Sequence, residues 1–186
     1  MTVPPEKCLP SCGAITYLHP GITLQWGDLV TLMIILSDNT ATNMLIDRLG
    51  IDNVNRMIDS LGLKNTRLNR RLFEPALSAR GIQNYITAAD CGIFLEKLLR
   101  GEIVSADASA QMLRTLSNQR LNGKMPFYLH SEGIRCAHKT GEDDGITHDV
   151  GVIYAASPRI FCFVSQNTDV PKSERALQDL AALIAR

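Results

Sequence analysis

At Met33-Ile34-Ile35-Leu36-Ser37-Asp38-Asn39-Thr40-Ala41-Thr42-Asn43-Met44, an apolar run ends in three small polar residues, and a second amphipathic run follows them. Ser, Asp and Asn side chains accept hydrogen bonds from backbone N–H groups at the start of a helix. The stretch therefore predicts a corner between two helices, capped by Asp38 or Asn39. A second interpretation places Ser37 and Asn39 in a cleft as functional side chains, and the rest of the chain is needed to choose between the two.

Further helices are predicted on both sides of this corner, because apolar residues recur there at helical spacing. Thr23, Thr87 and Ser105 are the expected N-caps, and Gly50 and Gly62 are expected to end two of the helices. The expected helices span about 24–36, 39–49, 52–61, 87–99, 105–116 and 173–186.

The segment from Leu63 to Ile86 is polar and shows no period. An irregular connection of this length inside a compact domain is more often functional than idle. After residue 133, short segments rich in β-branched residues alternate with turn signals, which predicts an antiparallel meander. The expected strands span about 134–138, 150–155 and 160–165, with turns at 141–145 and 157–159.

Helices followed by strands indicate an α+β fold. We expect a helical lobe over about 23–116, followed by a short antiparallel sheet and a C-terminal helix. At 186 residues, the chain suits a single domain over 1–186. Its expected parts are an irregular lead-in over 1–22, a mainly helical lobe over 23–133 with an Ω-like loop over 63–86, and strands plus a C-terminal helix over 134–186.

The composition argues against several classes of partner. The formal net charge is zero and no basic run occurs, so neither nucleic acid nor an anionic membrane is expected as a partner. No apolar stretch has the length needed to cross a bilayer. The first residues lack the basic and apolar regions of a signal peptide, which predicts that the chain as written stays in the cytoplasm.

The five cysteines do not form the pattern of a disulfide framework, because they are odd in number and scattered. Cys8 and Cys12 with His19 make at most an incomplete metal set, since no second pair stands at ligand spacing. We therefore expect neither a metal nor a cofactor.

Three places carry reactive groups outside the apolar pattern: Ser37-Asp38-Asn39, Glu74 in the irregular segment, and Lys139-Thr140-Gly141 at the end of a predicted strand. Each has an ordinary explanation when it is taken singly. The first is a helix cap, Glu74 is a surface charge, and the lysine is solvated ahead of a turn.

Together, and in this order, these groups resemble class A β-lactamases, a family of penicillin-recognising serine hydrolases marked by Ser-Asp-Asn and Lys-Thr-Gly. The resemblance covers roughly residues 9–186 and extends to Leu18-His19-Pro20-Gly21. Glu74-Pro75-Ala76-Leu77-Ser78 is similar to the family's Ω-loop motif Glu-Pro-x-Leu-Asn, which implies that Glu74 activates the deacylating water. Ser78 stands where the family has Asn, so one usual ligand of that water is changed.

The resemblance implies a β-lactamase/transpeptidase-like fold, with a small-molecule β-lactam as the partner. The family reaction hydrolyses the β-lactam amide through a serine acyl-enzyme, which confers antibiotic resistance. Ser37 would relay a proton toward the leaving nitrogen, and Asn39 would support the substrate and the lysine. Lys139 and Thr140, with Gly141, would bind the substrate carboxylate and line the oxyanion site.

One signature of the family is missing. The family's nucleophile lies in Ser-x-x-Lys, and no serine in this chain is followed by lysine three residues later. The resemblance therefore predicts a chain that begins after the nucleophile helix, with an N-terminal segment as a further candidate partner. It also predicts negligible turnover by the chain alone. The family is exported whereas this chain carries no export signal, so its location is left open.

Two alternatives stay open beside a serine β-lactamase. One is a non-catalytic penicillin-binding remnant, and the other is an esterase or carboxypeptidase relative. Glu74-Pro75 argues against the second alternative, because an acyl-enzyme that is not rapidly deacylated does not need that carboxylate.

Overall fold

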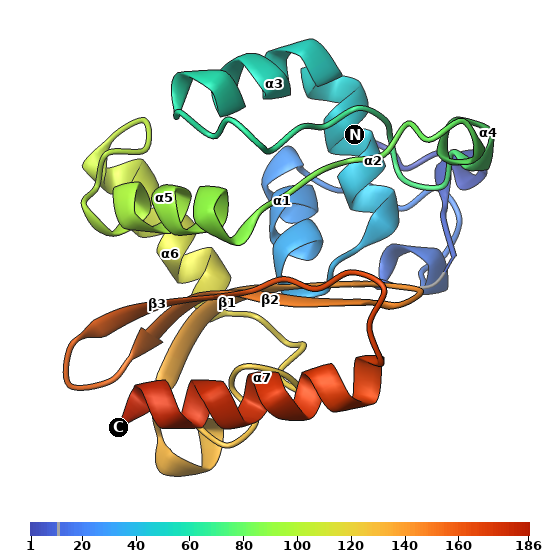
Figure 1. The fold of residues 1–186 in the computed structure, drawn as a ribbon. Coiled ribbons are helices and arrows are strands. Elements are labelled where there is room, and N and C mark those ends of the chain that lie inside the picture. The colour runs from blue at the N-terminus through green and yellow to red at the C-terminus, as the bar shows by residue number, and fades with distance from the viewer. Residues whose placement is uncertain (11) are drawn as a thin grey trace. The chain divides into compact units, whose positions relative to one another are not determined.

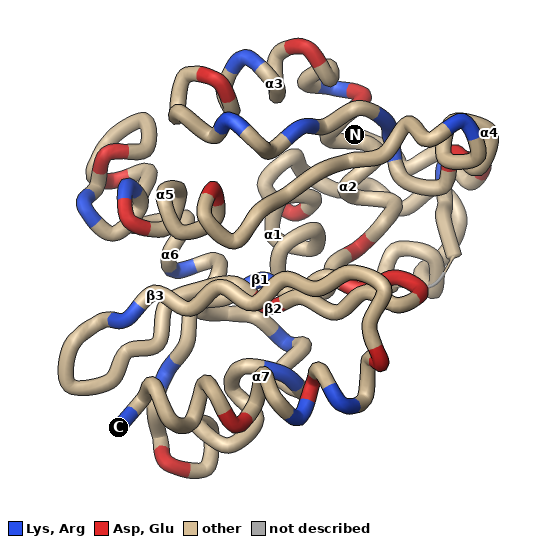
Figure 2. Tube along the Cα trace, in the orientation of Figure 1, with Lys and Arg blue, Asp and Glu red and all other residues tan. Residues whose placement is uncertain are grey.

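The computed structural model describes residues 1–10 and 12–186, and it divides into two compact units, Met1–Ile86 and Thr87–Arg186. The fold is the α+β type that the sequence predicts, with helices and a three-stranded antiparallel sheet (Figure 1). Charges of both signs are distributed along both units (Figure 2). No helix within the described ranges combines the length and the apolar character needed to cross a membrane.

The first unit consists of helices and irregular chain. Its helices are η1 (Pro5–Lys7), η2 (Ile15–Tyr17), α1 (Trp26–Ile35), α2 (Asn39–Leu49), α3 (Ile51–Ser60) and α4 (Pro75–Ala79). The prediction of Thr23 as a cap is wrong, because Thr23 pairs with Thr2 in an isolated β-bridge. Gln25 is the N-cap of α1, and its backbone N–H donates to the Asp28 carboxylate at 2.8 Å.

A small apolar core holds the first unit together. Its fully buried members come from the lead-in, α1 and α2: Val3, Ile15, Leu29, Ala41, Met44 and Leu45. Burying a side chain of the size of leucine or isoleucine contributes about 1.5–3 kcal/mol. The segment before α1 thus contributes two residues, Val3 and Ile15, to this core.

The second unit contains α5 (Ala88–Leu99), α6 (Ala106–Ser117), η3 (His130–Glu132), β1 (Arg135–Asp143), β2 (Ile146–Tyr154), β3 (Pro158–Phe163) and α7 (Val170–Ala185). Two predicted N-caps are confirmed there. The Thr87 and Ser105 hydroxyls accept hydrogen bonds from the backbone N–H groups of Asp90 and Ala108, each at 3.1 Å. The two helices predicted over 87–99 and 105–116 therefore belong to the same unit as the sheet.

The sheet has the order β1-β2-β3 and lies between helices, with α5 and α6 on one face and α7 on the other (Figure 1). The predicted turn over 141–145 is too long. β1 continues to Asp143 and β2 begins at Ile146, so only Asp144 and Gly145 form the turn. Gly145 has a φ of +64°, which suits a two-residue Asp-Gly hairpin turn. Gly141 therefore lies inside a strand.

Candidate functional site

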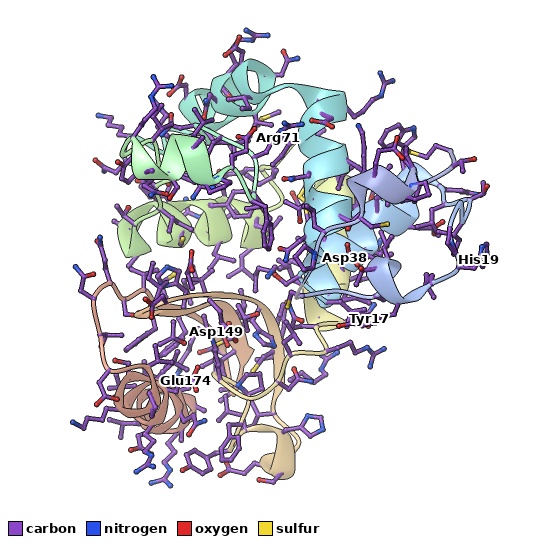
Figure 3. The ribbon with its side chains drawn as sticks, turned by 90° about the vertical axis from the view of Figure 1, so that its right-hand side faces the viewer. Tyr17, His19, Asp38, Arg71, Asp149 and Glu174 are labelled. Carbon is purple, nitrogen blue, oxygen red and sulfur yellow. The ribbon has the colours of Figure 1, made fainter. Side chains whose placement is uncertain are left out.

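The corner at residues 37–39 is built around a buried carboxylate. Asp38 is 1% exposed, and its Oδ2 accepts hydrogen bonds from the backbone N–H groups of Ala14 at 2.7 Å and Ile15 at 2.9 Å. Its Oδ1 accepts from the N–H of Ala41 at 2.9 Å, which confirms Asp38 as the cap of α2. Figure 3 shows Asp38 pointing into the first unit. One side chain thus caps a helix and ties it to the lead-in.

The backbone around Asp38 is constrained on both sides. Gly13 has a φ of +116°, and a Cβ there would lie 2.2 Å from Asp38 Oδ2, so no larger residue fits. Ser37 has a φ of +54°, in a left-handed region that costs a non-glycine residue about 1–2 kcal/mol. Asn39 is half-buried, and its Nδ2 donates to the Pro10 carbonyl at 3.2 Å. Capping by Asp38 is therefore compatible with a functional role for its two neighbours.

The Ω-like loop over 63–86 is closed at its neck and clamped to α2. Arg67 and Tyr85 exchange two backbone hydrogen bonds, at 3.0 Å and 2.9 Å. The Asn43 side chain accepts from the Leu72 N–H at 2.8 Å and donates to the Leu72 carbonyl at 3.0 Å. Asn43 lies one helical turn after Asn39 on the same face of α2. This spacing from Asn39 is a sequence signal that could have marked Asn43, which is not among the predicted site residues.

Glu74 is held by an arginine of its own loop. Its Oε1 lies 3.1 Å from Arg71 Nε and 3.0 Å from Arg71 Nη2, and its Oε2 accepts the Arg71 backbone N–H at 3.0 Å. Phe73, just before it, has a φ of +57°. Arg71 also contacts Asp47 at 3.2 Å, and Asp47 binds Lys7 at 2.8 Å. The carboxylate is therefore part of a charge network on α2 and the loop.

The network shifts the pKa values of two of its members. A hydrogen bond from Lys7 is the largest cause holding the pKa of Asp47 below its ordinary value, and Arg71 adds to it. The hydrogen bond to Glu74 is the largest cause raising the pKa of Arg71, which Figure 3 labels. Both groups therefore stay charged at neutral pH, so the network keeps its ion pairs.

Lys139, Thr140 and Gly141 are consecutive residues of β1. The half-buried Lys139 donates from Nζ to the Thr140 carbonyl at 2.6 Å, and the Thr140 residue is 6% exposed. Gly141 lies opposite His148 on β2, and a Cβ at Gly141 would approach His148 Cδ2 to 3.2 Å. The glycine therefore lets the histidine ring pack against the strand.

Lys124 supports the Gly141 end of the Lys139-Thr140-Gly141 motif, although no sequence pattern predicts this role. It is 4% exposed, and its Nζ donates to the Gly141 carbonyl at 3.1 Å. Two carboxylates compensate its charge, Glu142 at 3.0 Å and Glu174 of α7 at 3.6 Å. Glu174 also accepts a hydrogen bond from the Thr147 hydroxyl at 3.0 Å. Lys124 and Glu174 therefore connect the Lys139-Thr140-Gly141 motif to α7, on which Figure 3 labels Glu174.

His138, the residue before Lys139, is held by a buried cluster of polar side chains. The His138 Nδ1 lies 2.9 Å from Asp149 Oδ1, and both residues are almost fully buried. Asp149 Oδ2 accepts the Met125 N–H at 2.9 Å, and His138 Nε2 faces Asn122 Oδ1 at 3.1 Å. Figure 3 labels Asp149 at the sheet. Because both ring nitrogens of His138 and both carboxylate oxygens of Asp149 are engaged in this buried position, they fix the position of β1 at the lysine.

His148 makes the stability of the second unit dependent on pH. Burial lowers its pKa below the ordinary value of 6.5, and its Nδ1 accepts the Ser165 N–H at 3.0 Å. The folded state favours the neutral His148 ring. The contribution of this ring to stability is therefore complete when the pH lies above the pKa that His148 has in the unfolded chain. The effect is lost as the pH falls from there through the lower folded pKa.

We therefore expect the free energy of unfolding to decrease between neutral pH and pH about 5, with part of the decrease absent in His148→Asn. Asparagine offers a neutral oxygen to the same N–H and does not titrate. Urea unfolding at several pH values measures the difference, and His19→Asn in the exposed lead-in is the matched control. Identical pH dependence of wild type and His148→Asn would contradict this assignment.

The predicted site residues fall into two groups. Ser37, Asn39 and Glu74 belong to the first unit. Ser37 lies just before the N-cap of α2, Asn39 is the first residue of that helix, and Glu74 lies in the loop clamped to it. Lys139, Thr140 and Gly141 belong to the second unit, on β1. Each group is thus built and supported within its own unit.

Cys91, which is buried, and the half-buried Cys136 and Cys162 are poor nucleophiles. Burial raises the pKa of the Cys91 and Cys136 thiols to about 12 and that of Cys162 to about 11. A thiol with such a pKa is almost entirely protonated at neutral pH, whereas the thiolate is the reactive form. In the part of the chain that the structure describes, no three His, Cys, Asp or Glu residues are arranged to hold a metal ion.

Comparisons with known proteins agree with this fold. A family model described as the β-lactamase enzyme family matches residues 1–186. A β-lactamase from Sphaerobacter thermophilus DSM 20745 is 34% identical, with 100% of this chain and 72% of that chain covered and a TM-score of 0.87. PBP-A is 27% identical, with 100% and 69% covered and a TM-score of 0.85.

A mutant of PBP-A, solved as an acyl-enzyme complex with penicillin G, is 28% identical to this chain. Its match covers 100% of this chain and 69% of that chain, with a TM-score of 0.84. No curated protein matches the chain.

Proposed function

Because the chain belongs to the β-lactamase enzyme family, we propose that it is a β-lactam-recognising domain of the class A serine hydrolase type. The observation that carries the proposal is the presence of two motifs within one chain-wide family match. These are Ser37-Asp38-Asn39 at the start of α2 and Lys139-Thr140-Gly141 on β1. The acyl-enzyme of a PBP-A mutant with penicillin G supports a β-lactam as the ligand.

The substrate carboxylate binds Lys139 in this proposal. Lys139 is half-buried, and a charge-assisted hydrogen bond from its ammonium group is stronger than a neutral one. β1 is an edge strand of the three-stranded sheet, so alternate backbone N–H groups point away from β2. Such donors, placed beside Thr140 and Gly141, are the kind that stabilise an oxyanion.

Ser37 and Asn39 serve the proton relay and the support of the substrate in this proposal, and Glu74 holds the hydrolytic water. Glu74 Oε1 already accepts two hydrogen bonds from the Arg71 side chain, whereas Oε2 accepts one from the Arg71 backbone. An ionised carboxylate oxygen has about two acceptor positions. Oε2 is therefore the atom with room for a water.

The 186 residues contain no Ser-x-x-Lys, so the activated hydroxyl that acyl transfer requires is not among them. We expect this chain by itself to recognise a β-lactam without forming an acyl-enzyme. A penicillin-binding role without hydrolysis is the second candidate, and the similarity to PBP-A favours it. The free acceptor position of Glu74 favours the hydrolase type.

The role of Lys139 is tested by equilibrium binding. Lys139→Ala removes the cation that pairs with the substrate carboxylate, and hydrogen bonds to charged groups contribute about 1.5–3 kcal/mol. We expect the Kd for benzylpenicillin, measured by calorimetry, to rise by about tenfold or more. Lys172→Ala is the matched control, because Lys172 is a largely exposed lysine on α7. If Lys139→Ala left the Kd unchanged, Lys139 would not be the carboxylate-binding group.

A further inference from the structure

A cavity at the start of β1 is lined by two arginines and, within the described residues, by no carboxylate. Its volume is about 260 Å³, and its lining includes Arg120, Arg135 and His130, together with the side-chain amide of Asn122. None of its lining residues, all of them in the described part of the chain, is Asp or Glu. The whole cavity belongs to the second unit.

The two arginines of this cavity are not neutralised by the fold. Arg120 is exposed, and its guanidinium makes no hydrogen bond or ion pair with any residue that the structure describes. The Arg135 guanidinium lies over the Tyr154 ring, 5.5 Å from its centroid. Stacking of this kind leaves the N–H edges of the guanidinium available. Lys124 also lies between α6 and β1, but carboxylates compensate its charge.

Two other cavities differ in this respect. The cavity of about 600 Å³ beside Glu74 also contains Asp47 and Asp52 along with its arginines. The cavity of about 440 Å³ at the end of α7 contains Glu132 and Asp179. Carboxylates compensate the cations in both, so neither presents a net positive lining to an anion as the cavity at β1 does.

We propose that the cavity at the start of β1 binds a small tetrahedral oxyanion, inorganic phosphate or a phosphomonoester. A guanidinium presents two parallel N–H groups that match two oxygens of a phosphate. Asn122 Oδ1 is engaged by His138 Nε2 at 3.1 Å, so the Nδ2 of Asn122 is left as a further donor. A volume of about 260 Å³ lies below the range of about 300–1,000 Å³ for drug-sized ligands, which favours a small anion.

The test is a calorimetric titration of the chain with inorganic phosphate at constant ionic strength. We expect saturable binding, and we expect Arg120→Gln and Arg135→Gln each to weaken it by about tenfold or more. Arg114→Gln on α6 is the matched control, because Arg114 is also exposed and does not line the cavity. Its affinity should stay within about twofold of wild type, since a charge outside the cavity acts only through screened solvent.

Three outcomes would overturn the proposal. If phosphate binding did not saturate, the cavity would not be a specific binding site. An equal loss in Arg114→Gln would indicate a general effect of charge. Acetate that binds as tightly as phosphate would reject the tetrahedral class of ligand. A phenyl phosphate titration then separates free phosphate from phosphomonoesters, because only a site open to solvent on one side accepts the ester.

Discussion

Replacement of Asp38 by alanine is expected to lower the free energy of unfolding of the first unit by about 3–5 kcal/mol. The substitution leaves the backbone N–H groups of Ala14, Ile15 and Ala41 without their acceptor. A donor left unsatisfied in a buried position costs about 1–3 kcal/mol. The residue is 1% exposed, so water reaches this position poorly in the native fold.

Urea unfolding followed by far-UV circular dichroism measures the effect. Asp38→Asn should lie close to the alanine variant, because its NH₂ group would face N–H donors in place of one carboxylate oxygen. Asp52→Ala, an exposed aspartate in the first turn of α3, is the matched control and should cost less than about 1 kcal/mol. A loss of similar size in both alanine variants would mean that Asp38 does not hold the corner.

Local signals in the sequence predict much of this fold. Helix caps at Asp38, Thr87 and Ser105 are confirmed, because a cap depends on side chains within a few residues of the helix start. The cap predicted at Thr23 is wrong for a non-local reason. Thr23 pairs with Thr2, and the Gln25 backbone with Asp28 starts the helix instead.

The extent of β1 also depends on contacts far apart in the sequence. Glu142 and Asp143 are polar residues typical of a turn, yet both lie in the strand. Lys124 supports that end of the strand through the Gly141 carbonyl and the Glu142 carboxylate. The Asp144-Gly145 pair alone marks the turn correctly, but the polar residues just before it made the predicted turn too long.

The motif residues of the candidate site are visible in the sequence, but their supports are not. Asn43 binds Leu72 across 29 residues, and Lys124 binds Gly141 across 17. Such contacts leave no periodic pattern, because the partners are brought together by the fold. Sequence motifs name the candidate site residues, whereas the structure is needed to find what holds them.

The second large effect concerns turnover. We expect the 186-residue chain to hydrolyse a β-lactam on the order of a million-fold more slowly than an enzyme of the family with its nucleophile in place. That factor corresponds to about 8 kcal/mol of lost transition-state stabilisation. No Ser-x-x-Lys occurs in the chain, and the thiols of Cys91, Cys136 and Cys162 are protonated at neutral pH. Binding through Lys139 would remain, since it does not require the nucleophile.

The most direct measurement is steady-state hydrolysis of a chromogenic cephalosporin by the purified chain, with Glu74→Gln purified in the same way as the control for contaminating enzymes. Intact mass after incubation with benzylpenicillin is recorded on the same samples. We expect hydrolysis at the rate of buffer alone and no increase in mass. Steady hydrolysis well above buffer that Glu74→Gln abolishes, or a stable penicillin adduct on the chain, would contradict it.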